Sequence, residues 1–361
     1  MAEKKIGGSE RLIYLDLLRV LSAFCMIMLH VSSPGLSAPL GSFEWLVNNV
    51  YDGVTHFCVP VFIMISGAFL LDPEREYSLG KLYKVKILRI VTAFAFWSGF
   101  YAVINAFKRN LPLGKEYILE FLTDFIMGER HLWFLFTIAF LYAITPFFRK
   151  ITQDKRLTEY FLVLCVVFMF GLSNIGAFAL HGRIDKISDY VNENMNIHFV
   201  LGFAFYYVAG YYFKQFSLSR SLKLVLYALA VISAVIIPVG TYYYSAKIGA
   251  NFLTFYRYHS PPIGLLSVGI FVLFKDLFSG IELKSRAEKF VGFLSKYSFG
   301  IYLVHMAFVD FSYFVLKFFL SKTYLFNPVV SVPVISLAVF AVSLFVTWII
   351  SKIPVLNKYI M

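Results

Sequence analysis

Apolar residues form long runs along the chain, and few charged residues interrupt them. Two of the clearest runs are Leu224–Thr241 and Val329–Ile350. An α-helix needs about 20 apolar residues to cross a bilayer, whereas a membrane β-strand shows about ten residues of alternating character. The pattern therefore predicts an all-α, polytopic integral membrane protein built as a helical bundle.

The apolar runs divide the chain into ten predicted transmembrane helices, each about as long as a bilayer requires. The predicted spans are 12–33, 53–71, 88–107, 131–148, 158–178, 198–214, 222–244, 262–279, 297–319 and 328–351. The apolar segment Tyr117–Met127 is too short to cross and is expected at the membrane interface. No predicted loop is long enough for a folded domain, so residues 1–361 are expected to form a single transmembrane domain without an appended soluble domain.

Composition excludes a soluble enzyme. Hydrophobic residues make up 59% of the chain and charged residues 15%, whereas a soluble domain has about 45–50% and about 25%. The formal net charge of +12 is scattered among loops, which indicates membrane lipids as partners and not nucleic acid.

The positions of the basic residues predict the orientation. With the N-terminus in the cytoplasm, the inner loops and termini hold 22 of the 33 Lys and Arg residues, and the outer loops hold 10. Arg19 lies inside the first span and completes the count. Because cytoplasmic loops carry the excess of Lys and Arg, both termini are predicted to be cytoplasmic.

Cysteines and the N-terminus add little chemistry. The three cysteines all fall within apolar runs, without disulfide or zinc spacing, so no metal site is expected. Asp16 and Arg19 interrupt the first apolar run, which argues against a cleavable signal peptide.

The first span carries three ionisable residues, Asp16, Arg19 and His30. Arg19 and His30 are eleven positions apart, which is about 20° past three helical turns, so they share one face with a rise of about 16 Å between them. Asp16 precedes Arg19 by three positions and is expected to pair with it. Ionisable groups inside a membrane usually serve a site, although Arg19 as a snorkelling anchor and His30 as an interfacial histidine are the plain alternatives.

The next two spans offer weaker signals. Ser66 and Gly67 permit close approach of another helix or of a ligand. Lys84, Lys86 and Arg89 stand at the inner mouth of the third span, where they are suited to phosphate groups or, more plainly, to anchoring the helix.

The fourth and ninth spans add candidate polar residues. His131 and Trp133 open the fourth span at its predicted outer end, where Trp133 alone is typical of an interfacial aromatic belt. In the ninth span Tyr302 and His305 are three positions apart and are expected to share a face inside the bundle.

Taken in order, these segments resemble the motifs of the membrane acyltransferase family 3 proteins. The matching segments are Tyr14–Arg19 with His30, Pro60–Leu71, Lys86–Arg89, His131–Leu135 and Ser298–His305. Within the family, the chain is most similar to the short O-acetyltransferase branch that includes the enterobacterial common antigen O-acetyltransferase. One departure is Lys86, which stands where the family has the first arginine of an Arg-x-x-Arg motif and lacks the bidentate fork of arginine.

The resemblance implies a membrane enzyme that moves an acyl group, expected to be acetyl, from cytoplasmic acetyl-CoA to a hydroxyl of an extracytoplasmic cell-surface glycan or lipid-linked saccharide. His30 is then the general base or the transient acyl carrier, and Arg19 and Asp16 assist it. Acyl-CoA is expected to contact the residues Arg19, Ser66, Lys84, Lys86 and Arg89. The acceptor or the developing oxyanion is expected to contact His131, Trp133, Tyr302 and His305. The resemblance requires no metal and places the protein in a bacterial-type cytoplasmic membrane.

Two other functions remain open from the residues alone. A proton-coupled transporter or flippase of a lipid-linked sugar would use Asp16, Arg19, His30 and His305 as a relay, but no inverted repeat of broken spans is evident. A non-catalytic scaffold would use the same groups only as structural pairs. The sequence does not fix the oligomeric state.

Overall fold

The computed structural model describes residues 12–75, 78–110, 112, 114–171, 174, 202–281, 284–320 and 324–361. All regular structure in these ranges is helical, as the sequence predicts for a polytopic membrane protein. The first half of the chain forms α1 (Ile13–Ser32), η1 (Ser33–Ser37), α2 (Phe43–Thr55), α3 (Cys58–Leu70), α4 (Leu79–Lys81), η2 (Leu82–Ile87), α5 (Leu88–Lys108), α6 (Lys115–Met127), α7 (Trp133–Ala143), α8 (Thr145–Ile151), α9 (Lys155–Cys165) and η3 (Val166–Gly171). The second half forms α12 (Ala204–Gln215), α13 (Arg220–Ile248), η5 (Thr254–Tyr256), α14 (Pro261–Phe278), α15 (Ser285–Leu320), α16 (Pro328–Ile350) and α17 (Pro354–Tyr359).

Seven helical segments in the described ranges are long and apolar enough to cross a membrane, and the bent pair α7–α8 makes an eighth if it is one span. These eight correspond to eight of the ten predicted spans. The other two fall on α9 with η3 and on α12, and parts of both lie outside the described residues. The count of ten and the predicted orientation therefore stay predictions.

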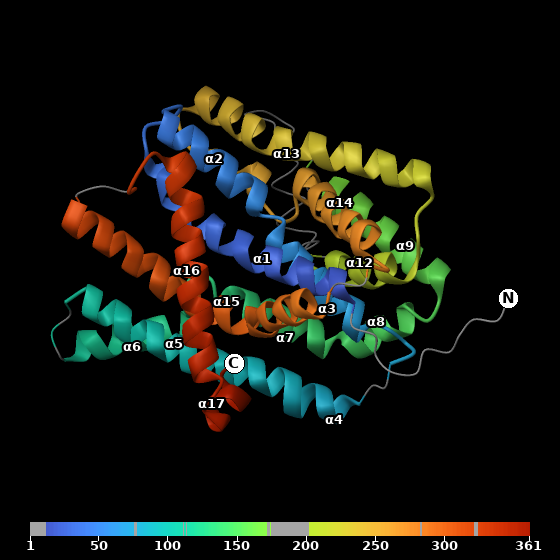
Figure 1. Ribbon diagram of the computed structural model, residues 1–361, viewed down its shortest axis with the longest axis horizontal. Helices are drawn as coiled ribbons and strands as arrows, with labels where there is room; N and C mark the ends of the chain where they lie inside the picture. Colours follow the sequence, from blue (N-terminus) through green and yellow to red (C-terminus); the bar gives the residue numbers. More distant parts are fainter. Residues whose placement is uncertain are drawn as a thin grey trace.

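Helix α1 is the central element of the bundle. It packs against α2, α3, α14, α15 and α16, and it runs through the middle of the molecule in Figure 1. Helix α13 lies at the edge of the same view, and only 17% of its apolar window is buried inside the protein. The face of α1 that carries the predicted site residues is thus enclosed by other helices, while α13 presents its apolar residues to lipid.

Helices α3 and α12 cross with their backbones in contact. A Cβ atom added to Gly67 would overlap the carbonyl oxygen of Tyr207, and one added to Gly210 would overlap the carbonyl oxygen of Met64. Small residues permit this kind of approach between membrane helices. Gly67 therefore serves helix packing, one of the two roles that the Ser66–Gly67 pair allows.

Helix α6 folds back along α5, as Figure 1 shows. The Ser98 hydroxyl, near the middle of α5, donates to the carbonyl of Phe125 at 2.5 Å, close to the end of α6. The chain then passes through residues 128–132, which are not helical, before α7 begins at Trp133. The predicted fourth span consequently begins beside the middle of α5, and the segment Tyr117–Met127, predicted to lie at the interface, packs along that helix.

The predicted second span is also longer and broken. Helices α2 and α3 together form one 28-residue apolar segment, Phe43–Leu70, interrupted at His56 and Phe57. His56 lies at this interruption, where its Nδ1 is 2.7 Å from the carbonyl oxygen of Asp52. The sequence places His56 near the start of a span, whereas the structure places it in the middle of one.

Candidate functional site

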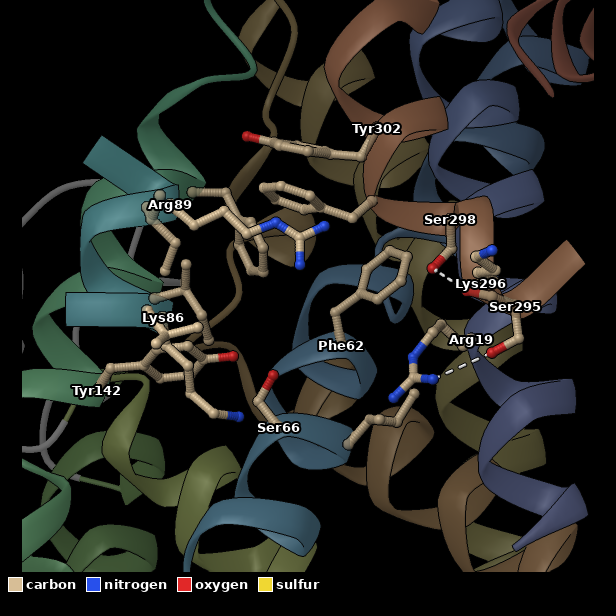
Figure 2. Close-up of a pocket in the computed structure, with 16 residues that line it drawn as sticks. Arg19, Phe62, Ser66, Lys86, Arg89, Tyr142, Ser295, Lys296, Ser298 and Tyr302 are labelled. Atoms are coloured by element: carbon tan, nitrogen blue, oxygen red, sulfur yellow. Dashed lines mark hydrogen bonds between the residues drawn. The ribbon is translucent and has the colours of Figure 1, made fainter. Parts of the chain in front are cut away.

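A cavity of about 400 Å³, the larger of the two described below, lies between α1, α3, η2, α5, α7 and α15. Figure 2 shows its side chains converging from opposite walls. Its lining comprises Arg19, Phe62, Ile65, Ser66, Val85, Lys86, Arg89, Ile90, Phe134, Ile138, Tyr142, Ser295, Lys296, Ser298, Phe299 and Tyr302. Four cations and no carboxylate line it, so the cavity is suited to an anionic ligand.

The cations stand against aromatic rings. The guanidinium of Arg89 lies 5.6 Å from the centre of the Phe299 ring, and the Lys86 ammonium lies 6.0 Å from the centre of the Tyr142 ring. Such contacts restrain a long side chain without neutralising its charge. The Arg89 Nε also donates to the carbonyl of Met361, so the end of the chain holds this side chain in place. Lys86 and Arg89 therefore keep positive charge available to a ligand.

Arg19 is held by a small polar network. Its Nη1 donates to the Ser295 hydroxyl at 3.0 Å and to a carboxylate oxygen of Asp16 at 3.3 Å. The Ser295 hydroxyl in turn donates to the same Asp16 oxygen at 2.5 Å. The expected pairing of Asp16 with Arg19 is present, and α15 fixes it through Ser295. Asp16 thus orients Arg19 and does not itself line the cavity.

In two pairs of nearby residues, one residue lines the larger cavity and the other does not. Lys86 lines the cavity and Lys84 does not, although both are exposed. Both belong to the π-helical turn Leu82–Ile87, and residues two positions apart on a helix do not share a face. Similarly, Ser66 lines the cavity while Gly67 packs on α12.

A second cavity of about 40 Å³ adjoins the first. Its lining comprises Met26, Leu29, His30, Cys58, Val59, Phe62, His131, Trp133, Phe134, Tyr258 and Tyr302. Phe62, Phe134 and Tyr302 line both cavities, so they form the wall between them. Arg19 and His30, predicted to share a face of α1, line the larger and the smaller cavity respectively.

Three histidines meet beside the smaller cavity, His30 from α1, His305 from α15 and His131 from the non-helical segment 128–132. The ring centre of His305 is 5.2 Å from that of His30 and 5.0 Å from that of His131. Histidine, cysteine and carboxylate groups in the described part of the chain form no metal-binding cluster of three or more. Neutral imidazoles supply acid–base chemistry, so the grouping of three is suited to proton transfer.

The hydrogen bonds of His305 fix its tautomer. Its Nδ1 is 2.7 Å from the carbonyl oxygen of Tyr302, which only accepts, so Nδ1 carries the proton. The buried Nε2 then has a lone pair and makes no hydrogen bond with the described residues. The two ring nitrogens of buried His131 likewise make no hydrogen bond of normal geometry there. Buried polar atoms of this kind are costly unless a substrate or water satisfies them.

Tyr302 is a positioning residue. Its hydroxyl donates to the backbone carbonyl of His131 at 2.8 Å, which holds the non-helical segment 128–132 against α15. Non-helical backbone at membrane depth is tolerated where protein or a cavity surrounds it, and such breaks often mark substrate sites. Because its hydroxyl is engaged, Tyr302 is a weaker oxyanion donor than the sequence indicates.

Trp133 stands at the other side of the smaller cavity. Its ring stacks on Phe203 at 5.6 Å between centres and lies 5.6 Å from Tyr258. It is 36% exposed, so one part of the ring is accessible while another lines the cavity.

Sequence reasoning missed several lining residues. Lys296 and Ser295 stand at the inner start of the predicted ninth span, where a Lys next to Ser and Tyr reads as an ordinary loop. Tyr142 and Tyr258 are two of 24 tyrosines, so composition alone does not single them out. Only the meeting of α5, α7, α14 and α15 around α1 brings them to the cavities.

Comparison with known proteins agrees with this arrangement. Residues 12–352 match the family model described as "Acyltransferase domain", that of acyltransferase family 3. The chain is also similar to YfiQ of Bacillus subtilis (strain 168), named as a membrane-bound acyltransferase, with 24% identity over 319 residues that cover 83% of this chain and 82% of that protein. No solved structure matches. These matches give no support to the transporter alternative, and a match across nearly the whole chain, with the family's basic and histidine motifs gathered around two adjoining cavities, shows that this protein belongs to the membrane acyltransferases of family 3.

Proposed function

We propose that the protein is an O-acetyltransferase that moves an acetyl group from cytoplasmic acetyl-CoA to a hydroxyl of an extracytoplasmic cell-surface glycan. The observation that carries the proposal is the pair of cavities. A large cavity with four cations shares a wall with a small cavity that contains His30. An anionic donor with a long neutral arm fits this sequence of environments.

The larger cavity would hold the donor. Arg19, Lys86, Arg89 and Lys296 would neutralise the phosphate groups of CoA, and Ser66 would lie beside the pantetheine arm. Arg19 and His30 are separated by a rise of about 16 Å along α1, so an extended arm is needed to bring the thioester to the histidine. The wall of Phe62, Phe134 and Tyr302 is where the arm would pass.

The smaller cavity would hold the reacting groups. The acceptor hydroxyl oxygen bonds to the thioester carbonyl carbon, the carbon–sulfur bond breaks, and the hydroxyl proton passes through His30 to the CoA thiolate. The products are the glycan ester and free CoA. In the second route, a ring nitrogen of His30 bonds to the thioester carbonyl carbon, the carbon–sulfur bond breaks, and the CoA thiolate takes the proton of the ring. The acceptor hydroxyl oxygen then bonds to the acetyl carbon, the carbon–nitrogen bond breaks, and the hydroxyl proton returns to the ring. The ring centre of His305 lies 5.2 Å from that of His30 and 5.0 Å from that of His131. His305 and His131 would therefore orient the acceptor or share the proton.

The acceptor side rests on aromatic residues. Trp133 and Tyr258 line the smaller cavity, and aromatic rings with a polar group are suited to contact with sugars. A lipid-linked saccharide in a bacterial cytoplasmic membrane is the acceptor that the short O-acetyltransferase branch would favour.

The test is transfer of labelled acetyl from acetyl-CoA to a membrane glycan extract by the purified protein in lipid. Wild type should label glycan, and His30→Ala should lower the rate by about 100-fold or more, because acid–base catalysis contributes about 10²–10⁴-fold. Labelled glycan from His30→Ala at the wild-type rate would exclude His30 from the chemistry. Binding of acetyl-CoA by folded protein without any transfer, whatever glycan is supplied, would contradict the enzyme assignment for this donor.

The donor site has a matched pair of controls. Lys86→Ala should raise the KM for acetyl-CoA by about tenfold, since a hydrogen bond to a charged group contributes about 1.5–3 kcal/mol and Lys86 is partly open to water. Lys84→Ala, two residues away but outside the cavity, should change KM far less. Equal effects of the two substitutions would contradict the assignment of the larger cavity to CoA.

A further inference from the structure

The smaller cavity has two chemically different sides. His30 and His131 contribute polar groups, while Met26, Leu29, Cys58, Val59 and the aromatic wall contribute apolar surface. A carbonyl group with a short hydrocarbon tail has the same division. From the polar and apolar lining together, the cavity is suited to an acyl group whose carbonyl faces the histidines.

The volume of this cavity limits what it accepts. With about 40 Å³, the smaller cavity offers about a tenth of the volume of the larger cavity, so it is suited only to a small group. An acetyl group has about three heavy atoms, and each further methylene adds one. We propose that the smaller cavity is the acyl-binding pocket and that its walls, Met26 and Val59 above all, restrict the donor to two-carbon and closely similar acyl groups. The inference rests on the proposed function and adds to it the residues that set specificity.

The walls are placed so that they resist expansion. Met26 lies one helical turn before His30 on α1 and is 4% exposed, and neighbouring Cys58 on α3 is fully buried. Close-packed interiors yield little to an added methylene, which is why over-filling a core destabilises it. On α3, Val59 lies beside Cys58 and faces the same cavity. A longer acyl chain would therefore need room that these two helices do not leave.

The larger cavity does not offer the same restriction. It has about ten times the volume and is lined by the cations that would hold the phosphates. A pocket that selects acyl length must lie where the thioester carbonyl reaches the histidine, and only the smaller cavity contains His30. Because the pantetheine arm would occupy the passage beside Phe62, Phe134 and Tyr302, the acyl tail cannot extend back toward the larger cavity.

The experiment measures kcat/KM for acetyl-, propionyl-, butyryl- and hexanoyl-CoA in wild type and variants, with glycan extract as acceptor. In wild type kcat/KM should fall at least about tenfold from acetyl to butyryl, because one methylene in a fitted pocket changes specificity by about 10–200-fold. Met26→Ala should raise the butyryl-to-acetyl ratio about tenfold. The matched control is Met28→Ala, which removes the same atoms from the same helix without touching the cavity.

Val59→Ala is a second variant that enlarges the pocket from α3, in case Met26→Ala does not fold. A raised ratio in either pocket variant, with Met28→Ala unchanged, supports the acyl pocket. Wild type that uses hexanoyl-CoA as well as acetyl-CoA would overturn it while leaving the acyltransferase function intact. The same change of ratio in Met28→Ala would also overturn it, since the effect would then not come from the cavity. Wild type that transfers no acyl group would remove the proposed function and this inference with it.

Discussion

Adjacent residues on α3 have separate tasks. Ser66 lines the larger cavity, while Gly67 allows α12 to pack closely against α3. A side chain at position 67 would meet backbone, which cannot rotate away as a flexible side chain does. The helix that presents Ser66 to the larger cavity is therefore fixed by the glycine next to it.

Gly67→Ala should lower the stability of the protein by about 2 kcal/mol or more, because the new Cβ overlaps the Tyr207 carbonyl and over-filling a packed site costs about 1–3 kcal/mol. Thermal unfolding in detergent measures the effect. Gly99→Ala is the control, since its Cβ would lie 3.6 Å from the Phe125 ring, an ordinary contact. That substitution should be neutral or slightly stabilising, as alanine favours a helix by about 0.5–1 kcal/mol over glycine. A Gly67→Ala protein as stable as wild type would show that α3 and α12 do not pack this tightly.

At the scale of residues, the sequence predicts those relations that involve residues of a single helix. The shared face of Arg19 and His30 and the pairing of Asp16 with Arg19 follow from helical spacing alone. The difference between Lys84 and Lys86 agrees with the same spacing, because residues two positions apart on a helix do not share a face, although the family resemblance implies that both contact the ligand. Lys296 was missed because its partners across the cavity come from other helices.

Among the helices, the connection from α6 through the non-helical residues 128–132 to α7 matters most for the site. It brings His131 to His305 beside the smaller cavity, at a break that Tyr302 ties to α15. Periodicity predicted the apolar character of both pieces but not their arrangement. A short apolar helix has the same pattern whether it lies on the membrane or packs along a neighbour, and the hydrogen bond from Ser98 that distinguishes these cases is a tertiary contact.

Tyr302→Phe should reduce kcat about tenfold while leaving the fold and the KM for acetyl-CoA nearly unchanged. The substitution keeps the ring in the wall between the cavities but removes the donor to the His131 carbonyl, so the break is held less firmly. A small displacement of reacting groups is sufficient for a loss of this size. Steady-state kinetics in lipid separates kcat from KM. Tyr297→Phe is the control, since Tyr297 lies on the same helix outside both cavities. An unchanged kcat would show that the hydrogen bond does not position the site.

For the whole molecule, the central question is which side of the membrane each cavity faces. The larger cavity is built from the ends of spans that the basic residues assign to the cytoplasm, near Lys86 and Lys296. The smaller cavity is lined by Cys58 and Val59, directly after the break between α2 and α3, and by His131 of the non-helical segment 128–132. A donor from the cytoplasm and an acceptor from outside would meet at the shared wall only if this orientation is right.

The orientation can be tested with a membrane-impermeant maleimide, because the three native cysteines, Cys25, Cys58 and Cys165, are all buried and should not react. Lys81→Cys, exposed before α5, should react in inverted vesicles but not in intact spheroplasts. Lys247→Cys, exposed at the end of α13, should show the opposite pattern. Wild-type protein and denatured protein give the lower and upper limits of labelling. The reverse pattern would place the four cations on the outer face, where cytoplasmic acyl-CoA does not reach them, and the direction of transfer proposed above would then be wrong even though the chain remains an acyltransferase.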